Sequence, residues 1–293
     1  MKSIRPSFFI VGAPKAGTTA LHYFLDKHPE VCMSADKEPN YFSQQEISEQ
    51  LLYYKKTNST TESTYLSLFH PTLATKIAGE GSVSYLFYPK VAARIKSFSS
   101  DAKIIISLRH PVQRAFSHYQ MDYSLGYVNE TFENIFRNGQ THPKTGKYFQ
   151  QYFLLGHYGT QVERYLKTFG EDNVLILLHE DIIQDPKNVI QKLCQFLRIN
   201  DTALPSDIEK QNVTMAGKNK TIQWLYKQKF FRKTIGVLFN EQSKAKIKSL
   251  LFSKQNLPQL DQKLAIELLH YYQEEMLLLE RISTLNIKKW IHN

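Results

Sequence analysis

The stretch Phe8-Phe9-Ile10-Val11-Gly12-Ala13-Pro14-Lys15-Ala16-Gly17-Thr18-Thr19 joins an apolar run to a helical pattern. Residues 8–11 lack polar alternation, which is typical of a strand buried on both faces of a parallel sheet. A helix is predicted over 18–27, closed by His28 and Pro29. Glycines allow the backbone to approach a ligand closely, and the free amides of a helix start attract anions. The stretch therefore predicts a phosphate-binding strand–loop–helix unit.

Other apolar runs extend this pattern along the chain. Strands are predicted over 103–108 and 173–178, with a weaker candidate at 31–33 and a possible fifth at 82–86. Helical patterns cover 112–123, 188–197 and much of the last forty residues. Strands that alternate with helices predict βαβ units in a three-layer α/β sandwich with a central parallel sheet. Because no repeat or linker divides the chain, we expect a single domain over 1–293.

The charge composition indicates which kinds of partner the protein could bind. The 293 residues contain 37 Lys and Arg against 27 Asp and Glu, a formal net charge of +10. Such an excess favours anionic ligands, among them nucleic acids, phosphorylated nucleotides, acidic glycans and membrane surfaces. Cys32 and Cys194 are too few for a metal cluster. Without an export signal or an apolar run of membrane-spanning length, a cytoplasmic protein is expected.

The predicted phosphate loop departs from the pattern of nucleotide hydrolases, G-x-x-x-x-G-K-[ST]. Gly12, Gly17 and Thr19 are in register, but Thr18 stands where that pattern has Lys, and Lys15 is the only lysine of the loop. The strand over 103–108 is followed by Arg109, so it offers no carboxylate for magnesium. These departures argue against a metal-dependent NTPase or kinase, and no metal site is predicted.

Two motifs together resemble the sulfotransferases that use 3′-phosphoadenylyl sulfate. The first is Pro14-Lys15-Ala16-Gly17-Thr18-Thr19, and the second is Arg109-His110-Pro111-Val112-Gln113-Arg114-Ala115-Phe116-Ser117-His118-Tyr119. Within that superfamily the chain is most similar to the branch of heparan sulfate sulfotransferases and their bacterial relatives. Further support comes from residues 37–42, 79–85 and 285–290. The resemblance spans almost the whole chain and implies a P-loop NTPase-like sulfotransferase fold.

The resemblance implies how the donor is bound. Residues 15–19 would wrap its 5′-phosphosulfate, with the amides of Ala16, Gly17 and Thr18 and the hydroxyls of Thr18 and Thr19 as donors. Lys15 would lie beside the oxygen that bridges phosphate and sulfate, where negative charge grows as the bond breaks. Arg109 and Ser117 would bind the 3′-phosphate. Arg114 would either assist them or brace the fold.

A loop in the C-terminal third is expected to cover the nucleotide. Residues 212–220 have the Gly and Lys content of that loop in similar proteins, so Gly217, Lys218 and Lys220 are candidate phosphate contacts.

Transfer to an alcohol or amine requires a base for the proton of the acceptor. Glu38 occupies the position of the base in the heparan-type branch. It lies between Lys37 and an aromatic pair, Tyr41 and Phe42, where partial desolvation would raise its basicity. Two departures from similar proteins are Asn40, where some have His, and Gly81, where several have Lys. Asn cannot relay a proton, so a shared acid–base role at that position is not expected.

The acceptor is less well defined by the sequence. The stretch 137–147 carries Arg137, His142, Lys144 and Lys147 and either meets an anionic acceptor or is a solvated surface loop. Tyr158 either stacks near the adenine, lines the acceptor cleft or packs in the core. A saccharide is the expected acceptor, and lipids, polyketides and small alcohols remain alternatives.

Two other classes of function compete with a sulfotransferase. Asn40 and Gly81 keep open a catalytically inactive protein that binds adenosine phosphates. The net charge keeps open a nucleic-acid-binding protein, but the basic residues are spread along the chain without a recognition helix or zinc pattern.

Overall fold

The computed structural model describes residues 4–50, 59–141, 145–201, 216–217, 252–253 and 257–291. The described residues fall into two compact units. The first contains the described residues up to Arg114, those from Leu155 to Asp201, and those from Tyr271 onward. The second contains Ala115–Leu154 and the described residues between 211 and 270. The single domain expected from the sequence stays a prediction.

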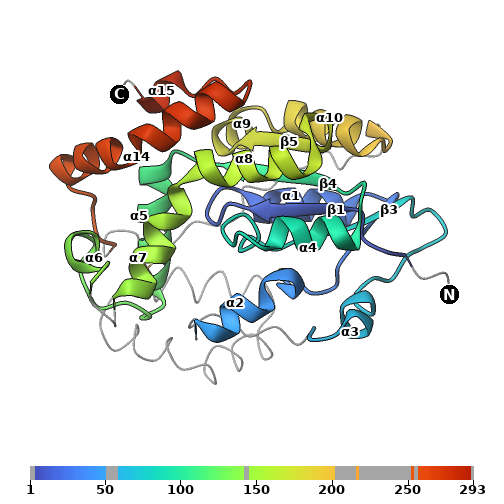
Figure 1. Cartoon of the computed structure of the whole chain (residues 1–293), viewed down its shortest axis with the longest axis horizontal. Helices are drawn as coiled ribbons and strands as arrows, with labels where there is room; N and C mark the ends of the chain where they lie inside the picture. Colours follow the sequence, from blue (N-terminus) through green and yellow to red (C-terminus); the bar gives the residue numbers. More distant parts are fainter. Residues whose placement is uncertain are drawn as a thin grey trace. The chain divides into compact units, whose positions relative to one another are not determined.

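Five parallel strands form the sheet of the first unit, side by side in the order β2-β3-β1-β4-β5 (Figure 1). Their bounds are β1 Phe8–Gly12, β2 Val31–Met33, β3 Ile77–Gly81, β4 Lys103–Leu108 and β5 Val174–Leu178. Every residue of the central strand β1 is buried, as its unbroken apolar sequence predicts. Four of the predicted strands are confirmed within one residue at either end.

The fifth predicted strand is wrong. The chain forms its strand at Ile77–Gly81, and residues 83–87, inside the predicted range 82–86 or next to it, form turns. The sequence of the observed strand does not predict a strand, because it contains Gly79, Glu80 and Gly81, and these residue types are depleted in strands. Gly79 is required there, since a Cβ at this position would lie 2.4 Å from the ring of Phe8 on β1.

Helices cover both faces of the sheet, which confirms the three-layer α/β sandwich with a central parallel sheet. On one face, side chains of α1 (Thr18–Lys27) and α10 (Pro186–Leu197) form one apolar cluster with Phe8, Ile10 and Ile105. No residue of α4 (Val91–Phe98) or α8 (Tyr158–Phe169) belongs to that cluster. These two helices contact each other, and α8 also contacts β4 and β5.

The remaining described elements complete the two units. They are η1 Tyr41–Ser43, α2 Gln44–Glu49, α3 Glu62–Leu66, α5 Pro111–Ser124, α6 Phe132–Asn138, α7 Gly146–Tyr152, η2 Leu154–Gly156, η3 Glu171–Asn173, α9 His179–Gln184, β6 Ala216–Gly217, β7 Phe252–Ser253, α14 Gln262–Ile282 and α15 Lys288–Ile291. In the second unit the ring of Phe132 packs 5.1 Å from Phe116 and 5.0 Å from Phe153. None of the helices in the described ranges is long and apolar enough to cross a membrane.

Candidate functional site

The phosphate loop, residues 12–19, follows the central strand β1 and opens helix α1. Lys15 and Gly17 both have positive backbone φ angles, 67° and 87°. Gly17 stands at the N-cap position of α1, and no side chain caps the helix there. The first amides of a helix have no acceptor within the helix, so an uncapped start is suited to an anion. The predicted anion site of residues 15–19 thus has the backbone geometry it needs.

The end of β4 supports this loop from one side. The amide of Ala13 donates to the carbonyl of Ser107 at 2.6 Å, and the Ser107 hydroxyl donates to the carbonyl of Ala16. One step beyond the strand, Nη1 of Arg109 donates to the carbonyl of Lys15 at 3.4 Å. Arg109 therefore lies against the loop, in agreement with its predicted place in the nucleotide site.

His179, the first residue after β5, also lies against the loop. A Cβ at position 17 would lie 3.1 Å from ring carbon Cδ2 of His179 and 3.1 Å from Ile182. Burial, together with the charges of Arg109 and Lys15, lowers the pKa of His179 to about 4. Its imidazole is therefore neutral at neutral pH. His179 was not among the predicted site residues, although it directly follows a predicted strand and so lies at the same edge of the sheet as the loop.

Nε of Arg109 is buried and has no hydrogen-bond partner among the described residues. Burial lowers the pKa of Arg109 and lowers that of His110 to about 4. Buried polar atoms are nearly always paired, so an unpaired one at one edge of a sheet is suited to a ligand. A guanidinium with a free Nε fits the oxygens of a phosphate group.

Arg114 and Tyr158 belong to the interior of the first unit. Arg114 is fully buried, and its side chain hydrogen-bonds Tyr272. Tyr158 is buried as well, with its ring 6.5 Å from that of Trp290. Burial raises the pKa of Tyr158 to about 12. Of the roles left open by the sequence, bracing for Arg114 and core packing for Tyr158 agree with these contacts.

The acidic turn, residues 37–42, meets the phosphate loop at the first turn of α1. Nζ of Lys37 donates to the hydroxyl of Thr19 at 2.7 Å and lies 3.5 Å from a carboxylate oxygen of Glu38. The side chains of Lys37 and Glu38 are each 35% exposed. Thr19 keeps its own hydroxyl proton for another acceptor. Glu38, predicted to be the base, is thus linked through one lysine to the loop predicted to hold the donor.

Asn40 and Gly81, the two departures from similar proteins, both help to hold the acidic turn. The Asn40 side chain accepts from the Ser84 hydroxyl at 2.6 Å and donates to the carbonyl of Glu38 at 2.8 Å. The carbonyl of Gly81 accepts from the amide of Glu38 at 3.1 Å. Asn40 therefore orients the backbone, as an amide side chain can, and carries no proton to or from the site.

The structure does not test the roles of several other predicted site residues, because they lie in the second unit or outside the described residues. Ser117 lies on α5 in the second unit, and Gly217 lies in β6. Lys218, Lys220, His142 and Lys144 are outside the described residues. In the second unit Arg137 forms ion pairs with Glu133 at 2.8 Å and Glu267 at 3.1 Å, and Lys147 lies in α7. The roles assigned to all of these residues stay predictions.

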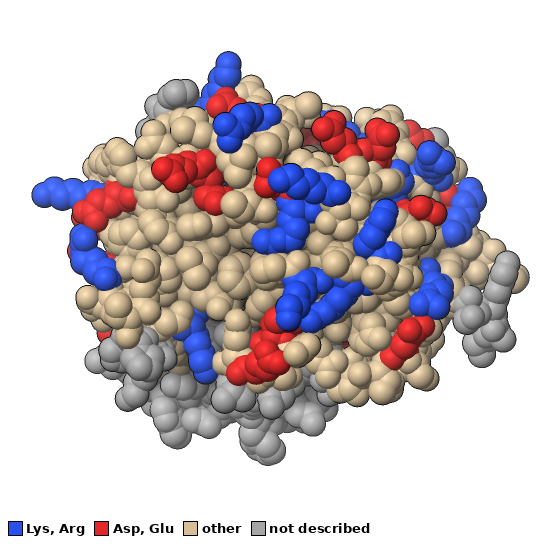
Figure 2. All heavy atoms as spheres, in the orientation of Figure 1, with Lys and Arg blue, Asp and Glu red and all other residues tan. Residues whose placement is uncertain are grey.

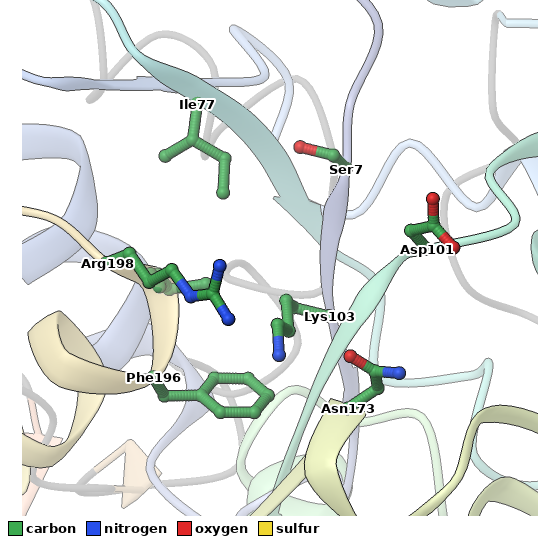
Figure 3. Close-up of a pocket in the computed structure, with 8 residues that line it drawn as sticks. Ser7, Ile77, Asp101, Lys103, Asn173, Phe196 and Arg198 are labelled. Atoms are coloured by element: carbon green, nitrogen blue, oxygen red, sulfur yellow. The ribbon is translucent and has the colours of Figure 1, made fainter.

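A hollow of about 390 Å³ opens at the opposite edge of the sheet (Figure 3). Ile77 and Lys103 begin β3 and β4, and Ser7 and Asn173 precede β1 and β5, so amino ends of strands form one wall. Residues 196–198, at the end of α10, form another part of the lining. Nζ of Lys103 already donates to the carbonyl of Asp172 at 2.9 Å and lies 5.0 Å from the ring centroid of Phe196. Ligands of open parallel sheets bind at the carboxyl ends, where the phosphate loop lies.

Comparison with known families and proteins agrees with these features. The family described as "Sulfotransferase domain" matches residues 5–278. The chain is 29% identical over 201 residues to the human bifunctional heparan sulfate N-deacetylase/N-sulfotransferase 2, a match covering 66% of this chain and 22% of that protein. It is 30% identical over 193 residues to the mouse heparan sulfate glucosamine 3-O-sulfotransferase 3B1, covering 66% of this chain and 46% of that protein. The matched region is thus less than half the length of either relative.

A solved structure resembles the chain over nearly its whole length. It is a sulfotransferase from Alicyclobacillus acidocaldarius, with a TM-score of 0.70 and 26% sequence identity. The alignment covers 98% of each chain.

Proposed function

The chain belongs to the sulfotransferase family, and on that premise we propose that it moves a sulfuryl group from 3′-phosphoadenylyl sulfate to a hydroxyl or amine of an acceptor. The observation that carries the proposal is the uncapped start of α1 behind the phosphate loop, with Arg109 against that loop and its Nε buried and unpaired. A backbone anion site beside a guanidinium with an unpaired Nε fits a nucleotide with two separate phosphate groups.

The residues that would hold the donor follow β1 and β4, with further contacts from α5 and from residues 217–220. The amides of Ala16, Gly17 and Thr18 and the hydroxyls of Thr18 and Thr19 would bind its 5′-phosphosulfate. Arg109 would bind the 3′-phosphate, with Ser117 as a further donor and Gly217, Lys218 and Lys220 covering the nucleotide. Lys15 and Arg109 place two positive charges close to His179, whose pKa they help to lower.

The chemical step would be an in-line displacement at sulfur. The acceptor oxygen or nitrogen forms a bond to sulfur while the bond from sulfur to the bridging oxygen breaks. Glu38 takes the proton of the acceptor, and Lys15 stabilises the charge that appears on the departing phosphate oxygen. The products are a sulfated acceptor and 3′-phosphoadenosine 5′-phosphate. No metal ion is needed in this scheme, because Lys15 supplies the positive charge.

A saccharide is the acceptor class we propose, since the relatives named above are heparan sulfate sulfotransferases. The stretch 137–147 is the proposed contact for an anionic acceptor, although Arg137 is engaged by two carboxylates of its own unit. The cytoplasmic location expected from the sequence stays a prediction.

The nucleic-acid alternative gains no support from the described residues on the face shown in Figure 2. On the face shown in Figure 2, Lys and Arg side chains lie among Asp, Glu and uncharged residues. Binding to a nucleic acid backbone calls instead for basic residues gathered in a patch or stripe.

Calorimetry with 3′-phosphoadenosine 5′-phosphate tests the donor site directly. Binding is expected, and its absence would contradict the proposed site. Turnover of labelled donor over pooled glycans and metabolites, read by mass spectrometry of sulfated products, then tests catalysis and identifies the acceptor. Binding without any turnover would favour the inactive nucleotide-binding alternative.

A further inference from the structure

A second carboxylate lies beneath the acidic turn and has no part in the mechanism above. Glu80, on β3, is fully buried. Three hydroxyls donate to it: Ser82 at 2.7 Å to one oxygen, and Tyr85 at 2.6 Å and Tyr65 at 3.1 Å to the other. Acids are seldom fully buried, and a buried carboxylate without donors is costly. These hydroxyls explain how β3 holds one.

Two of these hydroxyls also bind the acidic turn. The amide of Asn40 donates to the Ser82 hydroxyl at 3.0 Å, and the amide of Phe42 donates to the Tyr85 hydroxyl at 3.2 Å. Each hydroxyl therefore joins Glu80 to one backbone amide on the C-terminal side of Glu38.

The direction of these hydrogen bonds is set by Glu80. A hydroxyl has one proton and two lone pairs, so a proton given to a carboxylate leaves the oxygen free to accept an amide. Without the carboxylate, the hydroxyl protons of Ser82 and Tyr85 would have no fixed acceptor and could turn toward the amides.

The acidic turn needs such support because its backbone is strained. Glu38 has φ 62° and Asn40 has φ 53°, although neither residue is glycine. Conformations of this kind cost about 1 kcal/mol or more each and persist only where the surroundings hold them. The amide of Glu38 donates to the carbonyl of Gly81. Further along the turn, the amide of Asn40 donates to the Ser82 hydroxyl and the amide of Phe42 donates to the Tyr85 hydroxyl.

We propose that Glu80 is a positioning residue for sulfuryl transfer, which acts through the hydroxyls of Ser82 and Tyr85 to hold the turn that aims Glu38. The inference rests on the proposed role of Glu38 as the base. Glu80 itself touches neither donor nor acceptor.

Burial, with a smaller contribution from the charge of Glu38, raises the pKa of Glu80 to about 7, and the three hydroxyls act in the opposite direction. The hydroxyls therefore favour the charged carboxylate that accepts their protons. The titratable groups that face it are Tyr65, Tyr85, Tyr165 and Glu38.

Amide hydrogen exchange, followed residue by residue by NMR, tests the hold on the turn without an acceptor. In Ser82→Ala the Asn40 amide should exchange about tenfold faster, and in Tyr85→Phe the Phe42 amide should do so, because each loses one acceptor. In Glu80→Gln both amides should respond together. Tyr152→Phe, which removes a hydroxyl–carboxylate bond to Asp122 in the other unit, is the matched control and should change neither amide. Unchanged exchange at both amides in Glu80→Gln would overturn the inference.

Kinetics with the donor then test the consequence for catalysis. The rate of sulfate transfer from 3′-phosphoadenylyl sulfate to water should fall about tenfold in Glu80→Gln and further in Glu80→Ala. The affinity for 3′-phosphoadenosine 5′-phosphate should stay within about twofold, because the phosphate loop is built separately. Equal losses of rate and affinity would mean that Glu80 only supports the fold.

The two proposals fail in different ways. Faster exchange in the Glu80 variants together with full transfer in Glu38→Gln would remove Glu38 as the base and leave Glu80 as the residue that holds the turn. Loss of transfer in Glu38→Gln with unchanged exchange in Glu80→Gln would keep the base and remove the positioning role.

Discussion

The phosphate loop and the acidic turn lie at the same edge of one sheet, but different kinds of interaction hold them in place. The loop depends on backbone: Gly17 at φ 87°, an uncapped helix start, and carbonyls bound by Ser107 and Arg109. The turn depends on side chains, chiefly the hydroxyls that join it to the buried Glu80. Donor affinity should therefore be sensitive to backbone changes in the loop, and proton transfer to side-chain changes beneath the turn.

The largest expected effect separates these two functions at Glu38. Glu38→Gln should lower kcat about a thousandfold, since a positioned general base is worth about 10²- to 10⁴-fold. The affinity for 3′-phosphoadenosine 5′-phosphate, measured by calorimetry, should be almost unchanged. Glu46→Gln, which removes a carboxylate paired with Arg94 at 2.8 Å, is the control and should leave kcat intact. If nucleotide affinity fell along with kcat, the turn and the loop would not be separable.

The next effect concerns how the free energy of unfolding depends on pH. It tests Glu80, the carboxylate beneath the acidic turn. The pKa of Glu80 is raised to about 7 by burial, so the folded state binds its proton more tightly than the unfolded state does. Stability from this group is full below its unfolded pKa and is lost as pH rises to about 7, a change of about 3 kcal/mol. Relative to the wild type, Glu80→Gln should therefore gain in free energy of unfolding from pH 5 to pH 7.5.

Urea titrations of both proteins at several pH values would measure that difference. His110 and His179, whose pKa values burial lowers to about 4, contribute the opposite slope in both proteins and cancel. A difference between the proteins that does not change with pH would mean that Glu80 stays in one protonation state.

Lys15→Ala should lower kcat about a hundredfold, because one group that stabilises transition-state charge is worth about 10²- to 10³-fold. Its effect on nucleotide affinity should be smaller, since backbone amides carry much of the binding. Labelled-donor turnover and calorimetry measure the two quantities. Lys96→Ala, at a half-buried lysine bound to the carbonyl of Ser100, is the control. Full activity in Lys15→Ala would show that the lysine of the loop takes no part in the departure of the phosphate.

The smallest expected effect tests the backbone of the loop. Gly17→Ala should lower nucleotide affinity about tenfold and the free energy of unfolding by about 1–2 kcal/mol, because alanine resists a positive φ. The added Cβ would also press on His179 and Ile182 at 3.1 Å. Gly146→Ala, where the nearest atom to a Cβ is 3.4 Å away, should cost little. Equal behaviour of the two variants in calorimetry and urea titration would contradict the backbone account of the loop.

Much of the fold is readable from sequence because its strands are buried on both faces. Continuous apolar runs predicted β1 and β4, and the Thr18–Lys27 helix was predicted at its observed bounds. The strand Ile77–Gly81 was not, since its sequence is Ile-Ala-Gly-Glu-Gly. This segment forms a strand because of its neighbours in the folded chain. The Phe8 ring leaves room only for a glycine opposite it, and tyrosine hydroxyls donate hydrogen bonds to Glu80.

The site divides in the same way. The phosphate loop and Glu38 were found because short motifs carry them. Neither His179 against Gly17 nor the Glu80 network could be read from spacing, because each depends on which strands become neighbours. The carboxyl-end rule applied to the predicted strand over 173–178 would have drawn attention to His179, whereas no local signal marks Tyr65 as a partner of Glu80.

The walls of the phosphate loop have a consequence for biosynthesis. Ser107 is 91 residues downstream of the Ala16 carbonyl that it binds, and His179 follows later still. When only the first strand and helix have left the ribosome, the phosphate loop therefore still lacks the residues that support it. A ligand that binds only the completed arrangement stabilises it by mass action, so the cellular supply of donor nucleotide should favour finished molecules over partly folded ones.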